Sequence, residues 1–375
     1  MAPKRPQGAG ALEKRGPRRG PSPVPRAPGS PELYAALDLG TNSRRMLIAE
    51  PRGAGFHVVD SFSKSVQLGI GLESSGKLSR GSMSRTIQAL RICQQKLKRN
   101  KVRRMRLVAT EACRRAVNAK EFIDRVHRET GLRLDIIAPE EEARLAVISC
   151  APLVSPKTEN LLVVDIGGGS TELVWLDLSG VPRADRPRAI MRLREGLERE
   201  EPSQDGARVV DWISVPLGVA TLREQFSDVE DDAARFALMS WFFEENLADF
   251  SPYHATEPTE RFQIVGTSGT VTTVAASHLG LKRYDRTKVD GLRMTSDQID
   301  SVIRSYLTMG PGGRRADPRI GADRHALIMS GAAILQALMR CWPTNRLSVA
   351  DRGLREGLLY AQMSADGVLD TGALT

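Results

Sequence analysis

The stretches YAALDLGTNS (34–43) and LLVVDIGGGS (161–170) each place an apolar run before the pattern D-x-G-x-x-S. An apolar run is typical of a buried strand, and the polar, glycine-containing turn after it is typical of a hairpin. A second apolar run follows each turn, over 45–49 and 171–178. The two aspartates lie 127 residues apart, about the length of a domain. The sequence therefore predicts a duplicated strand–turn–strand unit with a cleft between the halves.

The turns themselves predict a phosphate site. Glycines let the backbone approach a ligand closely, and several N–H groups can then point at one anion, helped by the serine hydroxyl. A single D-x-G turn is an ordinary hairpin turn, in which Gly40 and Asn42 suit positive φ. Two copies at domain spacing, with a third glycine turn GTSGT (266–270), favour phosphate binding. An aspartate beside phosphate needs a cation, so the pattern indicates Mg²⁺.

The rest of the chain predicts an α/β fold, because helical and strand patterns alternate. The glycine pattern is neither a Walker A sequence nor G-x-G-x-x-G after a strand, which excludes P-loop and Rossmann folds. We expect Ser79 to cap one helix, Gly131 to end another and Pro139 to begin a third. The expected strands are 34–39, 104–110, 132–138, 161–166 and 346–351, and the expected helices are 79–98, 120–131 and 330–341. Residues 263–280 are expected to form a strand, a glycine turn and a helix. The charged, Pro-rich stretch 180–211 is expected to be an exposed loop.

The net charge of +9 points to a polyanionic partner, but most of that charge lies in one segment. Residues 1–30 hold seven basic residues and one acidic residue, which leaves +3 for residues 31–375. Seven prolines and five glycines in the same segment predict a disordered basic tail, because it cannot bury enough apolar surface. Nucleic acid is therefore not the expected partner.

Composition also excludes several classes of protein. No apolar run approaches the roughly 20 residues of a membrane helix, and the N-terminus lacks the apolar core of a secretory signal. The four cysteines are scattered without a Cys-x-x-Cys pair, so neither a disulfide framework nor a structural zinc site is expected. The cytoplasm is the expected compartment.

Six segments together resemble the exopolyphosphatase / guanosine pentaphosphate phosphohydrolase (Ppx/GppA) family, in its short two-domain form. They occur in the family's order over most of residues 34–360. The segments are ALDLGTNS (36–43), VATEACRRAVNAKEF (108–122), IIAPEEEARLA (136–146), VVDIGGGSTELV (163–174), VGTSGT (265–270) and VADRGLREGLLY (349–360). The resemblance implies two ribonuclease-H-like domains of the actin–hexokinase–Hsp70 superfamily, with a cleft between them.

The resemblance also implies roles for single carboxylates. Glu142, immediately before Ala-Arg, corresponds to the general base that activates the attacking water. The two glutamates before it read as favourable charge at a helix N-terminus. Asp165 and Glu172 correspond to metal-facing carboxylates, and Asp38 is the equivalent in the first half. Residues on opposite strands near a hairpin turn can face the same side, so Asp165 and Glu172 could share one Mg²⁺ ion.

Arginines and turn residues would bind the substrate. Arg114 and Arg324 match arginines of the family that clamp phosphate oxygens, and Arg114 is also expected to offset charge in the transition state. Arg44 and Arg45 depart from the small or apolar residue usual after the first turn. An extra cation there strengthens polyanion binding or points to solvent, and we include Arg45 in the site. The expected phosphate-binding turn residues are Gly40, Thr41, Asn42, Ser43, Gly167, Gly168, Gly169, Ser170 and Thr171.

These observations predict four segments: the tail 1–30, an N-terminal actin-like domain over 31–150, a C-terminal one over 151–366, and a short tail over 367–375. The predicted activity is hydrolysis of the terminal phosphate of inorganic polyphosphate or of the 5′-γ-phosphate of guanosine pentaphosphate. The turns read phosphates rather than bases, so both substrates stay open, and a homodimer is expected from the resemblance alone. The alternatives are a phosphotransferase (kinase) of the same superfamily and a non-catalytic polyphosphate-binding module.

Overall fold

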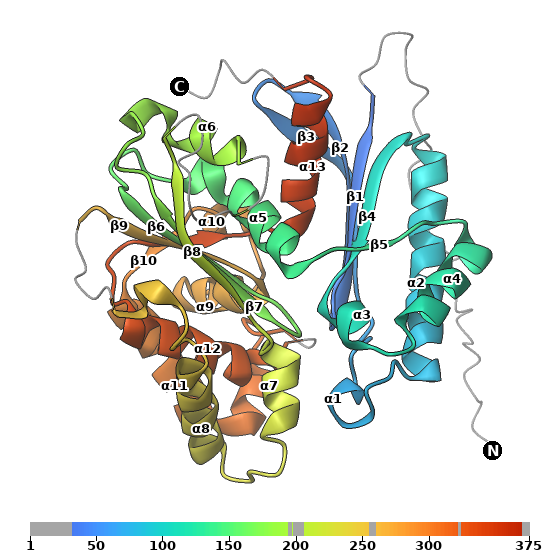
Figure 1. The fold of residues 1–375 in the computed structure, drawn as a ribbon. Coiled ribbons are helices and arrows are strands. Elements are labelled where there is room, and N and C mark those ends of the chain that lie inside the picture. Colours follow the sequence, from blue (N-terminus) through green and yellow to red (C-terminus); the bar gives the residue numbers. More distant parts are fainter. Residues whose placement is uncertain (1–31, 194–196, 198–205, 255–259, 322–323, 370–375) are drawn as a thin grey trace, which may run out of the picture. The chain divides into compact units, whose positions relative to one another are not determined.

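The computed structural model describes residues 32–193, 197, 206–254, 260–321 and 324–369 (Figure 1). The predicted basic tail 1–30 lies outside the described residues. Within the described residues, no helix is both long enough and apolar enough to cross a membrane.

The first sheet has the strand order β3-β2-β1-β4-β5. Its strands are β1 (Tyr34–Leu39), β2 (Ser43–Arg52), β3 (Gly55–Ser65), β4 (Arg104–Ala109) and β5 (Asp135–Ile136). The first three strands pair antiparallel, whereas β4 and β5 continue the sheet in parallel with β1.

The second sheet has the order β10-β11-β9-β6-β7-β8. Its strands are β6 (Asn160–Ile166), β7 (Thr171–Asp177), β8 (Arg208–Val215), β9 (Phe262–Thr267), β10 (Arg293–Met294) and β11 (Leu347–Ala350). Strands β6 to β8 pair antiparallel, and β9 and β11 run parallel to β6. Apart from the extra edge strand β10, the order and directions repeat those of the first sheet. The predicted α/β fold with a duplicated strand–turn–strand unit is confirmed.

Helices cover both faces of each sheet (Figure 1). Helices α2 and α4 share one apolar core with the first sheet, and α8, α9, α11 and α12 share another with the second. Helices α5 and α13 pack against each other between the two sheets, so closely that a Cβ on Gly357 of α13 would meet the backbone of Leu145 of α5. The helices are α1 (Leu72–Ser75), α2 (Arg80–Arg99), α3 (Glu111–Arg115), α4 (Ala119–Thr130), α5 (Pro139–Cys150), α6 (Arg186–Met191), α7 (Val219–Gln225), α8 (Asp232–Glu245), α9 (Gly269–His278), α10 (Arg286–Val289), α11 (Ser296–Ala316), α12 (Ile328–Cys341) and α13 (Leu354–Ala365).

The predicted helix ends are confirmed where a cap residue marks them. The Ser79 side chain accepts a hydrogen bond from the Ser82 amide at the start of α2, and Gly131 ends α4 in a left-handed conformation with φ of 72°. Pro139 is the first residue of α5, where its missing N–H costs nothing. Local chemistry decides these positions, so the sequence is sufficient to find them.

Two predicted segments differ from the structure. The strand expected over 132–138 pairs only at Asp135–Ile136, because it lies at the sheet edge and reaches only the end of β4. The expected exposed loop over 180–211 is wrong in its described part, which includes α6 and the start of β8 with Ile190 and Leu197 buried. The charged residues of this stretch do not indicate exposure, because the buried Arg186 donates hydrogen bonds to backbone carbonyls instead of facing water.

The last helix returns to the first sheet. Helix α13 follows β11 of the second sheet, yet its residues share an apolar core with Tyr34 and Val108 of the first. The Tyr34 hydroxyl donates to Asp366 at 2.8 Å, and the Gln362 amide donates to the Ala35 carbonyl at 3.2 Å. The domain boundaries predicted at residues 150 and 366 stay a prediction.

Candidate active site

The two D-x-G-x-x-S turns have the same local structure. The amide of Gly40 donates to the Ser43 carbonyl at 3.0 Å, and the amide of Gly167 donates to the Ser170 carbonyl at 2.9 Å. Each turn joins the central strand of its sheet to the antiparallel neighbour. The sequence repeat is therefore a repeat of backbone conformation.

The two turns meet. A Cβ placed on Gly168 would lie 3.1 Å from the Asn42 amide nitrogen, and one on Gly169 would lie 2.5 Å from Thr41 Oγ1. Neither Gly40 nor Asn42 has positive φ, so that expectation is wrong. The glycines of the second turn are needed because another backbone approaches them, which leaves no room for a side chain.

Most of the predicted residues line one pocket at this meeting point. Arg114, Thr171 and Glu172 are the three that do not line it. Thr171 is buried, and its hydroxyl donates to the Leu217 carbonyl at 2.7 Å. The predicted residues that line the pocket are Asp38, Gly40, Thr41, Asn42, Ser43, Arg45, Glu142, Asp165, Gly167, Gly168, Gly169, Ser170 and Arg324.

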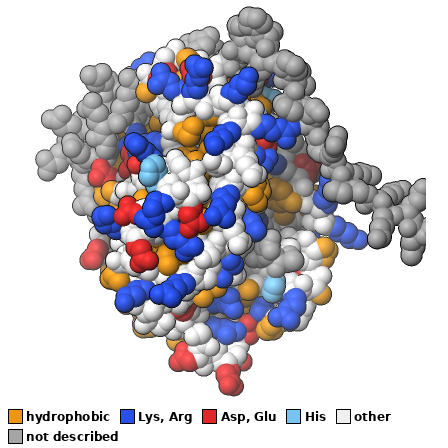
Figure 2. All heavy atoms as spheres, turned by 90° about the vertical axis from the view of Figure 1, so that its right-hand side faces the viewer, with side chains coloured by type: hydrophobic (Ala, Val, Ile, Leu, Met, Phe, Trp, Pro, Cys, Tyr) orange, Lys and Arg blue, Asp and Glu red, His pale blue; other side chains and the backbone are white. Residues whose placement is uncertain are grey.

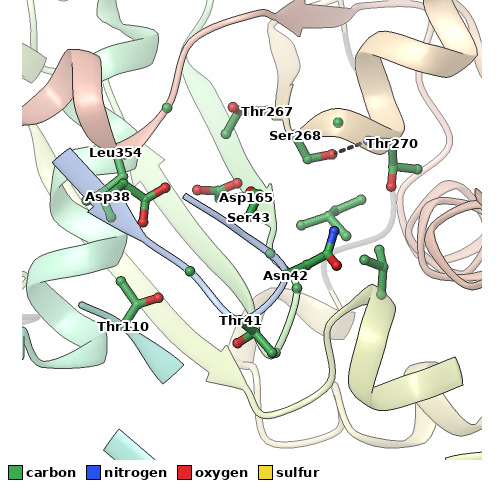
Figure 3. Close-up of a pocket in the computed structure, with 18 of the residues that line it drawn as sticks. Asp38, Thr41, Asn42, Ser43, Thr110, Asp165, Thr267, Ser268, Thr270 and Leu354 are labelled. Atoms are coloured by element: carbon green, nitrogen blue, oxygen red, sulfur yellow. Dashed lines mark hydrogen bonds between the residues drawn. The ribbon is translucent and has the colours of Figure 1, made fainter. Parts of the chain in front are cut away.

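Carboxylates from four elements gather beside the turns. Asp38 and Asp165 come from the ends of β1 and β6, and both point into the pocket (Figure 3). Glu142, in the first turns of α5, also lines the pocket although only 8% of its surface is exposed. Glu172 is the direct cross-strand partner of Asp165, as predicted from the hairpin, and is buried behind it.

Burial and mutual repulsion raise the pKa of these acids. Burial, with the charges of Glu142 and Asp38, raises the pKa of Asp165 to about 8. Burial and Asp165 raise the pKa of Glu172 to about 7, although hydroxyls of Ser170 and Ser214 oppose the shift. Burial and the charge of Glu172 raise the pKa of Glu142 well above its ordinary value, although Arg114 opposes this. The site is therefore short of positive charge around Asp165.

Arg114 lies against the acids rather than on the pocket wall. Its guanidinium donates to Glu142 at 2.8 Å, to Glu111 at 2.8 Å and to the Ile137 carbonyl at 3.0 Å. Three acceptors hold the group in one orientation, and it in turn holds the Glu142 carboxylate. In this arrangement Arg114 orients the predicted base.

The neighbouring arginines of β2 point to opposite faces of the sheet. Arg45 lines the pocket and is the cross-strand partner of Asp38. Arg44 is fully buried in the other face, where it donates to Cys93 and lies over the Phe62 ring at 4.2 Å. Arg44 therefore neither strengthens anion binding nor points to solvent, because alternation along a strand sends it into the core.

The third glycine turn also reaches the pocket. Ser268 has φ of 151°, a conformation that side chains rarely adopt, and its hydroxyl accepts from the amides of Thr270 and Val271 at the start of α9 (Figure 3). Arg324 donates to the Gly269 carbonyl at 3.0 Å and to Thr273 at 2.6 Å. This turn thus brings a helix N-terminus and an arginine to the same wall.

Sequence reasoning missed three charged residues of the pocket. Glu111 follows β4, and Arg352 and Arg355 flank the start of α13. Arg352 is paired with Asp290 at 2.8 Å, whereas the ion pair of Arg355 with Glu356 is longer at 3.7 Å. Burial lowers the pKa of Arg355, and the Glu356 carboxylate opposes this. The signal available was the segment VADRGLREGLLY, which carries both arginines.

Two further pockets share walls with this one. One has four arginines, Arg45, Arg324, Arg352 and Arg355, together with Asp351 and Ser63. The other shares Thr41, Asn42 and Leu327 with the site and is less polar. Its remaining wall is made of Gln67, Gly69, Ile70, Gly71, Ala220, Arg223, Glu224, Ser227 and Ala326.

The donor set fits a divalent cation that is completed by substrate. Among the described residues, no three His, Cys, Asp or Glu side chains form a ready metal cluster. Mg²⁺ commonly uses one or two carboxylates and takes its other oxygens from phosphates and water. Glu172 Oε2 is buried without a hydrogen-bond partner, next to Asp165, so positive charge would stabilise this pair.

Known proteins resemble this chain over most of its length. The family model described as the Ppx/GppA phosphatase family matches residues 47–366. The solved structure of a Ppx-GppA enzyme from Aquifex aeolicus is 30% identical, with a TM-score of 0.67 over 88% of this chain and 99% of that chain. An exopolyphosphatase-like protein is 25% identical, with a TM-score of 0.72 over 88% of this chain and 99% of that chain.

The fold also matches a more distant structure. An exopolyphosphatase from Cytophaga hutchinsonii is 21% identical, with a TM-score of 0.73 over 91% of this chain and all of that chain. At that identity, the likeness concerns the fold alone.

Proposed function

Because the chain belongs to the Ppx/GppA phosphatase family, we propose that it hydrolyses the terminal phosphoanhydride bond of inorganic polyphosphate. The observation that carries the proposal is the meeting of two glycine turns beside a buried group of carboxylates. Backbone amides and hydroxyls of such turns suit phosphate oxygens. A carboxylate with a raised pKa beside them suits proton transfer from water.

Glu142 would act as the general base. The water oxygen attacks the terminal phosphorus while one water proton moves to the Glu142 carboxylate. The bridging P–O bond breaks, the products are orthophosphate and a chain shorter by one phosphate, and the leaving oxygen carries the charge away. A pKa raised by burial lets Glu142 accept a proton near neutral pH, and Arg114 keeps the carboxylate in place.

Asp165 and Glu172 would hold Mg²⁺, with Asp38 beside them. When bound, the ion would supply positive charge to phosphate oxygens as the transferring group becomes more negative. The protein's own contribution is the buried wall that keeps the acids close together, and the charge of a bound cation would offset the rise in their pKa.

The four arginines of the adjoining pocket would bind the phosphates that follow the terminal one. Arg45 and Arg324 are predicted for this role, and Arg355 joins them because it lines the same pocket and its ion pair with Glu356 is long, at 3.7 Å. Planar guanidinium groups can bind two phosphate oxygens each.

Guanosine pentaphosphate is a second candidate substrate, hydrolysed at its 5′-γ-phosphate. The observation that favours it is the less polar pocket next to the turns, where Ile70 and Leu327 offer apolar surface and Glu224 could accept hydrogen bonds from a guanine edge. Comparing orthophosphate release from the two substrates decides between them.

The alternatives predict different products. A kinase would form a phosphorylated acceptor and need a nucleotide, whereas a binding module would tolerate loss of Glu142. The cytoplasmic location and the homodimer stay predictions, and cell fractionation and light scattering would test them.

The test is the variant Glu142→Gln, with orthophosphate release measured with and without Mg²⁺. We expect kcat to fall by about 10²–10⁴-fold, the usual contribution of a positioned base. The matched control is Glu141→Gln on the same helix, since Glu141 is paired with Arg106 and Arg144. Full activity of Glu142→Gln, or no activity of the wild type on either substrate, would overturn the mechanism.

A further inference from the structure

The charge of the folded chain is strongly uneven. Residues 74–110 contain eleven Lys and Arg residues and no Asp or Glu. Residues 31–375 together carry a net charge of only +3, so the residues of this range outside 74–110 have a net charge of −8. A segment of 37 residues with a charge of +11 lies within a chain that is otherwise negative, which makes it a candidate polyanion surface.

The segment forms one face of the first sheet unit. It contains α2 and β4, and the apolar side of α2 is buried in the core through Met83, Ile87, Leu90 and Leu97. The basic side chains are consequently left on the outer side. Figure 2 looks onto the side that carries α2 and α4 and shows Lys and Arg side chains gathered over it, with fewer acids among them.

Three of these cations lie at the junction of α2 and β4 and form what we call the basic corner: Lys98, Lys101 and Arg103. Lys101 has φ of 53°, and its amide donates to the Lys98 carbonyl at 3.1 Å, so the chain reverses tightly there. All three side chains are exposed. None forms an ion pair with a described residue.

Neighbouring cations are already neutralised. Lys96 is paired with Asp60 at 2.6 Å, Arg104 with Asp366 at 3.4 Å, and Arg106 with Glu141 at 2.9 Å. The basic corner is therefore one part of the segment whose charge the described residues leave uncompensated; Lys77, Arg80 and Arg85, nearer the start of the segment, form no ion pair with a described residue either.

The composition of the segment favours a ligand recognised by charge alone. Residues 74–110 contain no Phe, Trp, Tyr or His on which a nucleobase could stack. The apolar residues of α2 that could enter a membrane are buried in the core. An inorganic polyphosphate chain offers only phosphates, which Lys and Arg bind without help from aromatic groups.

We propose that the basic corner binds the distal part of a polyphosphate chain whose end lies in the active-site pocket, an inference that rests on the proposed function. Strand β4 connects the two places, because Arg104 follows the corner and Thr110 lines the pocket. Six residues of strand span about 20 Å. Only a chain long enough to cover that distance reaches both, so the corner makes the enzyme favour long chains.

The test is the full-length triple variant Lys98→Ala/Lys101→Ala/Arg103→Ala. Hydrolysis is measured with long-chain polyphosphate and with tripolyphosphate, and binding of the long chain is measured separately in the Glu142→Gln background. We expect KM and Kd for the long chain to rise about tenfold at low salt, with kcat and the tripolyphosphate KM unchanged. The slope of log Kd against log salt should become shallower by about 2, from three lost contacts.

The control removes the same charge elsewhere, through Lys157→Ala/Lys288→Ala/Arg315→Ala, all exposed residues outside the segment. Long-chain binding that is unchanged in the corner variant, or equally weakened in the control, overturns the proposal. If the wild type binds single-stranded DNA of equal charge more tightly than it binds long-chain polyphosphate, the choice of polyphosphate as the ligand is overturned. A wild type that binds the long chain through the corner but releases no orthophosphate supports the corner and contradicts the proposed function.

Discussion

The two glycine hairpins share a backbone but differ in one cross-strand pair. In the first hairpin the aspartate is opposite an arginine, Asp38 and Arg45, whereas in the second it is opposite a glutamate, Asp165 and Glu172. Burial raises the pKa of Asp38, and the charge of Arg45 opposes that shift. The second hairpin places two acids directly opposite each other, which is unfavourable unless a proton or a cation is shared.

We propose that this difference divides the work of the site. Arg45 would give the first hairpin a positive group for substrate phosphates, and the paired acids would give the second hairpin an affinity for a cation. Duplication of a fold thus produced two similar turns, and a single position seven residues after each aspartate made them chemically unlike.

Among the tests that compare the two hairpins, the largest expected effect comes from weakening the acid pair. Asp165→Asn should lower kcat on the order of 10²–10³-fold, because it removes a charge that would hold the cation. The matched change in the first hairpin is Asp38→Asn, which should cost less since Arg45 stays on the pocket wall. Orthophosphate release over a Mg²⁺ titration measures both, and a larger loss for Asp38→Asn would reverse the division of roles.

A smaller effect is expected from the cation of the first hairpin. Arg45→Ala should raise KM about tenfold, as for one lost charged hydrogen bond, with a lesser change in kcat. The adjacent Arg44→Met serves as the control, since Arg44 is in the core and its replacement by an apolar side chain should keep both KM and thermal stability. Equal KM for the two variants would remove Arg45 from the site.

The smallest expected effect is on stability and depends on pH. The pKa of Asp165 is raised to about 8 and that of Glu172 to about 7, so between pH 4 and 8 the folded state keeps protons that the unfolded state releases. Stability from this pair is therefore complete at acid pH and is lost as pH rises toward 8.

Differential scanning calorimetry of the metal-free protein measures this effect. Between pH 5.5 and 8.5, Tm of the wild type should fall by about 5 °C more than Tm of Asp165→Asn. Added Mg²⁺ should restore the wild-type Tm at the higher pH and leave the variant unchanged. If Tm falls with pH equally in the two proteins, the raised pKa values of the acid pair do not affect stability, which contradicts the prediction.

Much of the site could be predicted from sequence because its parts are local. The closing bonds of the turns, the cap at Ser79 and the start of α5 at Pro139 depend on neighbouring residues. The facing of Asp165 and Glu172 follows from strand alternation across a short turn.

Other parts could not be predicted, since they depend on contacts between distant segments. Arg44 and Arg45 are adjacent residues of the same type, and only the position of the core determines that Arg44 is buried and that Arg45 lines the pocket. Arg114 is held by Glu142, and Arg355 enters the pocket because α13 returns to the first sheet.

The sequence by itself determined the repeated turns, the alternation of elements and the residue types available for phosphate and proton chemistry. Tertiary structure decided which of those residues share one pocket, which charges are paired, and which pKa values rise. The physical reason is the distance along the chain over which each interaction acts. Turn and cap geometry is set within a few residues, whereas burial and electrostatic coupling arise only when distant segments are packed together.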